Sequence, residues 1–179
     1  MKTLIIVTLI MLVSSAWANS VAADFADGPV IFAYGKHVPV QQDMKLEKAA
    51  VLKVVFDVSA AGNDGALNRG FDSVARFLNM HAANGIPTND INLAIVIHGA
   101  ASNEMLSNTA YQTKYGKDNP NSELLMALMQ NKVKVVLCGQ SAAYHQIANK
   151  DMIEGVDMAL SAMTAHTIFA AKGYSQNPF

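Results

Sequence analysis

The stretch INLAIVIHG, residues 91–99, decides the fold class. It is apolar from Ile91 to Ile97 apart from Asn92, and it ends in His98 and Gly99. A strand that is apolar on both faces is typical of a parallel sheet covered by helices on each side. The stretch therefore predicts a central strand of an α/β domain.

Outward from this stretch, strand and helix patterns alternate along the chain. Such alternation favours a parallel sheet with helices on both faces and right-handed crossovers. Ser102 and Ser161 are expected helix caps, and Gly85, Pro87 and Gly173 are expected helix ends. The expected strands are 51–58, 91–97, 133–137 and 156–160, the expected helices are 67–82, 102–115, 123–130, 141–149 and 162–172, and 174–179 is a terminal extended piece.

The N-terminus has the pattern of a secretory signal peptide. Lys2 is followed by an apolar run from Leu4 to Val13, and Ala16-Trp17-Ala18 matches a small-x-small cleavage site. The run is about half the roughly 20 residues that a membrane-spanning helix needs, which argues against an uncleaved anchor. We expect residues 1–18 to be removed and the mature protein to be periplasmic.

After cleavage, we expect an N-terminal extension over residues 19–49 and one domain over residues 50–179. The extension holds at most one short strand, at Val30–Tyr34. Loss of Lys2 takes the formal net charge from −1 to about −2. Because the chain is near neutral and has no basic stripe, we expect no nucleic-acid partner. No second apolar run reaches membrane length.

The carboxyl ends of the expected strands carry polar and reactive side chains. They are Asp57 to Ser59, His98 with Gly99, Cys138 with Gly139, and Ser161. Sites in open α/β sheets form outside these ends. The sequence does not tell which strands are neighbours, so the meeting of these groups is a hypothesis.

Cys138 is the only cysteine, in VKVVLCGQSAAYH, residues 133–145. It follows a strand and precedes a helix, where free N–H groups and the helix dipole favour the reactive thiolate. The alternative is a buried structural thiol. The following GQSAA lacks the last glycine of a nucleophile elbow, so Ser141 is interpreted as a helix cap. The predicted catalytic residue is Cys138, and the predicted binding residues are His98, Gly99, Gly139, Gln140 and Ser141.

A zinc site built from Cys138 and three histidines, His98, His145 and His166, is a weaker interpretation, because no two ligands are closely spaced. His166 is read as a helix-face residue that packs sideways. The segment from Gly62 to Gly70 lacks the spacing of a phosphate loop, and Arg69 is at most an anion contact. We expect no metal and no cofactor.

The segments VVLCGQSAA (135–143) and VDMALSAMTAHTIFAAKGYSQNPF (156–179) resemble the DsrE/DsrF-like sulfur-relay family. LKVVFDVS, ARFLNMHAANGI, AIVIHGAA and YGKDNPNSELLMALMQNKVKVVLCGQS resemble successive family segments, so the resemblance covers about Val51 to Phe179. The signal peptide departs from the better-known cytoplasmic members.

The resemblance implies a Rossmann-like or flavodoxin-like three-layer α/β domain with a parallel sheet of about five strands. It also implies homo-oligomers, commonly trimers or hexamers, and a persulfide carried on Cys138. Three functions remain open: a periplasmic sulfur carrier or sulfurtransferase, a small-molecule or metal binding module, and a structural oligomer with an inert thiol.

Overall fold

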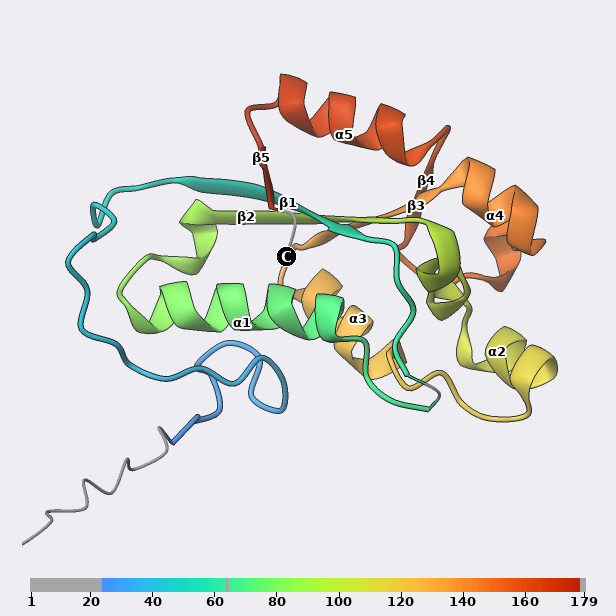
Figure 1. The fold of residues 1–179 in the computed structure, drawn as a ribbon, viewed down its shortest axis with the longest axis horizontal. Helices are drawn as coiled ribbons and strands as arrows, with labels where there is room; N and C mark the ends of the chain where they lie inside the picture. Colours follow the sequence, from blue (N-terminus) through green and yellow to red (C-terminus); the bar gives the residue numbers. More distant parts are fainter. Residues whose placement is uncertain (1–23, 64, 178–179) are drawn as a thin grey trace, which may run out of the picture.

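The computed structural model describes residues 24–63 and 65–177, and the expected signal peptide lies outside them. Five parallel strands form one sheet in the order β4-β3-β2-β1-β5 (Figure 1). The predicted parallel α/β sheet of about five strands is therefore confirmed. The strands are β1 Leu52–Val58, β2 Ile91–Ile97, β3 Lys134–Cys138, β4 Asp157–Ala159 and β5 Ser175–Asn177.

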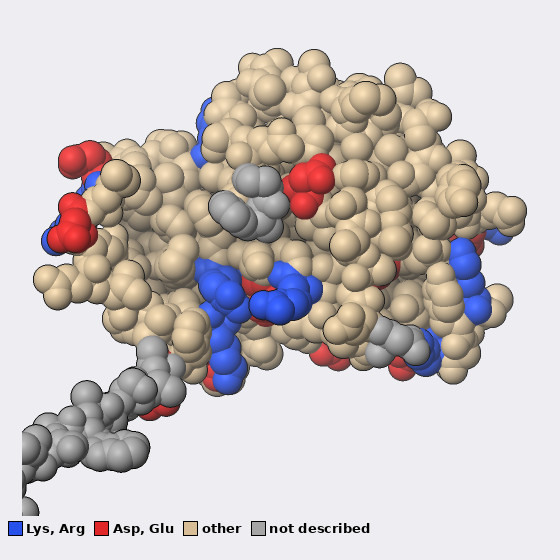
Figure 2. All heavy atoms as spheres, in the orientation of Figure 1, with Lys and Arg blue, Asp and Glu red and all other residues tan. Residues whose placement is uncertain are grey.

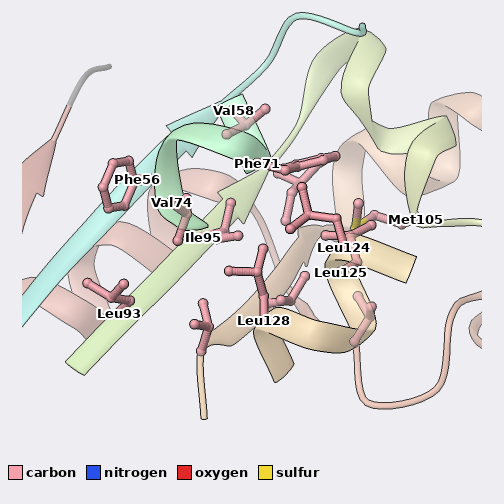
Figure 3. Close-up of a cluster of buried hydrophobic side chains, with 14 of the residues drawn as sticks. Phe56, Val58, Phe71, Val74, Leu93, Ile95, Met105, Leu124, Leu125 and Leu128 are labelled. Carbon is pink, nitrogen blue, oxygen red and sulfur yellow. The ribbon is translucent and has the colours of Figure 1, made fainter. Parts of the chain in front are cut away.

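Helices cover both faces of the sheet, and they cover them unequally. Helices α1 (Arg69–Ala83) and α3 (Ser122–Gln130) lie on one face, and α5 (Ala162–Ala171) lies on the other (Figure 1). The first face carries the larger apolar cluster, part of which is drawn in Figure 3. The second face carries a small cluster against α5: Val55, Ala94, Val96, Val136, Ala165 and Phe169. The α5 side therefore contributes the smaller part of the apolar core.

Alternation along the strands assigns each side chain to a face. In β2, Leu93, Ile95 and Ile97 belong to the larger cluster, whereas Ala94 and Val96 belong to the smaller one. All of them are buried, which explains why the stretch is apolar almost throughout. Within residues 24–63 and 65–177, no helix is long and apolar enough to cross a membrane.

Two expected helices differ in the structure. The helix expected over 102–115 is a 3-10 helix, η2 (Gly99–Met105), followed by α2 (Asn108–Tyr115). The cap of α2 is Ser107, whose hydroxyl accepts a hydrogen bond from the Ala110 N–H group at 3.3 Å. Ser102 is instead buried inside η2, so the prediction that it caps a helix is wrong.

The helix expected over 141–149 is also displaced. It is α4 (Gly139–His145), and Cys138 occupies the N-cap position. Ser141 therefore lies inside the first turn of α4 and does not cap it. Ser161 does cap α5, since its hydroxyl accepts from the Thr164 N–H group at 3.0 Å.

The described part of the N-terminal extension packs on α1. Val30–Tyr34 forms turns rather than a strand. Asn79 of α1 is fully buried, and its side chain accepts from the N–H groups of Val30 and Ile31 and donates to the carbonyls of Ile31 and Tyr34. One asparagine thus satisfies the backbone of a segment that has no regular structure of its own.

Candidate functional site

The carboxyl ends of three neighbouring strands present polar side chains to the α5 face. Asp57 pairs in register with Val96, and Cys138 pairs with Ala159. Both partners belong to the α5 face, since Val96 lies in the smaller apolar cluster and Ala159 packs against it. Ile97 pairs with Leu137, so one residue further His98 lies beside Cys138, on strands about 4.8 Å apart. Asp57, His98 and Cys138 therefore share one face at one edge of the sheet.

Cys138 lies where two helices begin. Its sulfur receives hydrogen bonds from the hydroxyl of Ser141 and from the N–H groups of Ser141, Ala162 and Gln140. Gln140 and Ser141 start α4, whereas Ala162 starts α5. Burial raises the pKa of the Cys138 thiol, but these hydrogen bonds outweigh it and leave the pKa below its ordinary value of 9.0. The site favours a thiolate, although Cys138 is only 5% exposed.

Gly139 is needed because the chain that precedes α5 crosses directly over it. A Cβ atom at this position would lie 2.7 Å from the carbonyl oxygen of Ala159 and 3.2 Å from that of Leu160. The absence of a side chain lets the β4–α5 connection approach the start of α4. Gln140 also contacts this connection, as its side chain donates to the Leu160 carbonyl at 3.2 Å. Both residues thus position Ala162 near the sulfur.

One carboxylate at this edge binds two histidines. Asp57 Oδ2 lies 3.0 Å from His98 Nε2, and Asp57 Oδ1 lies 2.7 Å from His166 Nε2. Burial raises the pKa of the Asp57 carboxyl, and the hydrogen bonds from both histidines overcome this, so the pKa lies below its ordinary value. The aspartate is ionised at neutral pH and links β1, the end of β2 and α5.

Gly99 and Ser141 connect the histidine side of the site to the thiol. The Gly99 N–H group donates to Ser141 Oγ at 3.1 Å, and the same hydroxyl hydrogen-bonds the sulfur of Cys138. Gly99 has a φ of +56°, which glycine adopts without strain. His145 Nε2 lies 2.9 Å from the Gly99 carbonyl oxygen and ties α4 to η2. His145 is therefore a structural link rather than a group directed at the thiol.

The structure thus places the five expected binding residues and Cys138 together at one edge. Three members were missing from that prediction, and one of them is Asp57, which binds both histidines. His166 contacts Asp57 instead of packing sideways, and Ala162 supplies an N–H group to the sulfur. Among the described residues, no three or more His, Cys, Asp or Glu side chains are arranged to hold a metal ion.

The glycine-containing loop after β1 borders a cavity that adjoins the site at Asp57. The cavity has a volume of about 410 Å³ and is lined by Asp57, by the loop and by Arg69 at the start of α1. The loop is anchored by Glu104, whose carboxylate accepts from the Gly62 N–H group at 2.7 Å and from Asn68. Burial raises the pKa of Glu104. Glu104 therefore holds Gly62 and Asn68, and Arg69 lies at the cavity.

The protein is a Rossmann-like α/β domain with a hydrogen-bonded thiol at the end of a strand. The model of the DsrE/DsrF-like family matches residues 52–176, and the chain belongs to this family, which is generally associated with sulfur relay. No curated protein matches the chain significantly.

Two solved structures are similar to this chain. A protein of unknown function from Methanobacterium thermoautotrophicum, MTH1491, is 14% identical with a TM-score of 0.52, over 72% of this chain and 99% of that one. The ychN protein from E. coli is 18% identical with a TM-score of 0.49, over 70% of this chain and 96% of that one. At these identities, the likeness concerns the fold alone.

Proposed function

We propose that this protein carries sulfane sulfur as a persulfide on Cys138 and passes it to another molecule. The observation that supports this most strongly is the set of hydrogen bonds on the Cys138 sulfur, from one hydroxyl and three N–H groups. They stabilise a thiolate, which is the nucleophilic form of cysteine. The same donors stabilise the thiolate that is released when the outer sulfur leaves.

The absence of any other cysteine in the chain fits a carrier. A persulfide on Cys138 cannot be discharged within the chain as a disulfide, because no second thiol is present. The sulfur must therefore pass to another molecule. The persulfide forms when the thiolate attacks a terminal sulfur of an inorganic polysulfide. The bond between that sulfur and the next one breaks, and the remaining sulfur atoms leave as a shorter polysulfide.

The rate of iodoacetamide alkylation against pH tests this proposal on folded protein. We expect labelling at Cys138 with a midpoint below about 7.5, within the range of activated cysteines. Cys138→Ser should take up no label. A midpoint at or above the ordinary thiol value would contradict the proposal.

A structural domain with an inert thiol is the second candidate, and the 5% exposure of Cys138 favours it. Iodoacetamide separates the two candidates, because an inert thiol reacts only after the protein unfolds. Labelling should therefore be compared in buffer and in urea. Reaction confined to the unfolded protein would replace the carrier with this alternative.

We also propose that α5 forms a contact between subunits of a homo-oligomer. Its sequence, AMTAHTIFAA, contains no charged residue, and the surface over it is almost entirely uncharged (Figure 2). Leu160, just before α5, and Met163, in its first turn, are 73% and 78% exposed. Apolar side chains on both faces of a helix are typical of a buried helix. Light scattering should give the mass of a trimer or hexamer, and a monomer would contradict the proposal.

Export is the third part of the proposal, and it depends on the signal-peptide pattern of residues 1–18. The mature chain should begin at or near Asn19 and occur in the soluble periplasmic fraction. Mass analysis of the protein from fractionated cells tests this. Intact Met1 in the membrane fraction would contradict it.

A further inference from the structure

The bridge from Asp57 to two histidines fixes where the protons lie. An ionised carboxylate accepts hydrogen bonds and donates none, so Nε2 of both His98 and His166 must carry a hydrogen. In the neutral form of each ring, Nδ1 then holds a lone pair. The arrangement resembles an aspartate that orients a catalytic base, with the difference that each carboxylate oxygen holds its own imidazole.

The two imidazoles differ in what Nδ1 can do. His166 Nδ1 is buried and has no hydrogen-bond partner. A proton there would be a buried donor without an acceptor, which is energetically costly. The His98 side chain is 32% exposed and lies at the end of β2. His98 is therefore the ring that can exchange a proton through Nδ1, while His166 holds Asp57 in place.

His98 also lies on the same face of the sheet as Cys138. The register between β2 and β3 makes the two residues neighbours on the α5 face. The next residue, Gly99, donates to the Ser141 hydroxyl that hydrogen-bonds the sulfur. An acceptor that reaches the thiol on this face therefore approaches the strand end that carries His98.

We propose that His98 is the general base for transfer of sulfur from Cys138 to an acceptor thiol, with Asp57 and His166 as positioning residues. This inference rests on the proposed carrier function. A thiol of ordinary pKa is protonated at neutral pH and is a poor nucleophile until its proton is removed. General bases accelerate such steps by about 10²- to 10⁴-fold.

The step balances without an oxidant or reductant. The acceptor thiol R–SH gives its proton to His98 Nδ1, and its sulfur attacks the outer sulfur of the Cys138 persulfide. The R–S to outer-sulfur bond forms, the bond from the outer sulfur to Sγ breaks, and the electron pair remains on Sγ. The products are R–S–SH, a Cys138 thiolate held by its N–H donors, and a protonated His98 beside the Asp57 carboxylate.

The test compares two acceptor thiols at neutral pH, using protein loaded with inorganic polysulfide and then desalted. 2-Mercaptoethanol is mostly protonated and needs a base, whereas 4-nitrothiophenol is mostly thiolate and needs none. In His98→Gln, we expect transfer to 2-mercaptoethanol to slow by about 100-fold and transfer to 4-nitrothiophenol to change less than about threefold. Glutamine can still donate to Asp57, which preserves the contact.

Further variants separate a base from a structural role. Asp57→Asn should reproduce the thiol-selective loss, because an amide can donate to Nε2 and force the ring hydrogen onto Nδ1. Added imidazole should restore transfer to 2-mercaptoethanol in His98→Ala. His37→Gln, in the N-terminal extension, is the matched control and should behave as wild type.

The results in His98→Gln and in wild type test the base and the carrier function separately. Equal slowing with both thiols in His98→Gln, or no slowing with either, would overturn the role of His98 as base. If the wild-type protein accepts no sulfur from polysulfide, the proposed carrier function fails and this inference fails with it. If wild type loads and the loss is confined to the protonated thiol, the inference stands.

Discussion

Replacement of Ser141 by alanine should raise the pKa of the Cys138 thiol by about 1 to 2 units. The Ser141 hydroxyl is the one side-chain donor to the sulfur, and it also accepts from the Gly99 N–H group at 3.1 Å. That second bond uses the oxygen lone pair and leaves the hydroxyl hydrogen free to point at the sulfur. Removal of the hydroxyl thus affects the thiolate directly.

The magnitude follows from the charge of the acceptor. A hydrogen bond to a charged group contributes about 1.5–3 kcal/mol, and one pKa unit corresponds to about 1.36 kcal/mol. The three N–H donors, from Gln140, Ser141 and Ala162, remain in the variant because they belong to the backbone. The variant therefore loses one of the four hydrogen bonds that stabilise the thiolate.

The assay is the pH dependence of iodoacetamide alkylation on folded Ser141→Ala protein. Ser102→Ala is the matched control, since the Ser102 hydroxyl is buried without a hydrogen-bond partner and so donates nothing to the thiol. The midpoint should rise in Ser141→Ala and stay unchanged in Ser102→Ala. An unchanged midpoint in Ser141→Ala would refute the idea that its hydroxyl stabilises the thiolate.

Three further substitutions test the structural account. Gly139→Ala places a Cβ atom 2.7 Å from the Ala159 carbonyl oxygen, so the free energy of unfolding in urea should fall by about 1–3 kcal/mol. An unchanged free energy of unfolding would contradict the close packing of the β4–α5 connection on Gly139. Asn79→Ala leaves several buried backbone groups unpaired, so the free energy of unfolding should fall by about 2–4 kcal/mol. Proteases should also cleave the variant faster before residue 50. Resistance to proteolysis equal to that of wild type would contradict the anchoring role of Asn79. The pKa of Asp57 is depressed in the folded state, so its contribution to stability is present above its ordinary value of 3.8 and is lost as the pH falls through the folded value. The difference in unfolding free energy between wild type and Asp57→Asn should therefore shrink below about pH 4 in urea titrations, and a constant difference would contradict it.

The sheet could be predicted because its strands are buried on both faces. Ile91–Ile97 and the strand before Cys138 leave almost no polar position, and this pattern has few other physical explanations. The error at Ser102 has a tertiary cause. The backbone of η2 is held by contacts such as the Ala101 N–H to Ser59 carbonyl bond at 3.1 Å, which local capping patterns do not reveal.

The positions of Cys138 and His98 in the site could be predicted, whereas the contact between Asp57 and His166 could not. Cys138 and His98 each follow an apolar strand, so their place at the carboxyl edge follows from the sequence. The contact between Asp57 and His166 joins residues 109 positions apart, and it depends on which strands are neighbours. His166 also occupies an uncharged helix with no sign of a polar partner. Only the folded arrangement reveals that the two residues meet.

The intact mass of the folded protein after incubation with inorganic polysulfide shows directly whether Cys138 carries sulfur. We expect the mass to increase by one sulfur atom per chain. The increase should be confined to Cys138, absent in Cys138→Ser and released by cyanide as thiocyanate. An unchanged mass for the folded wild-type protein, with modification of Cys138 only after unfolding, would contradict the claim that this thiol carries sulfur.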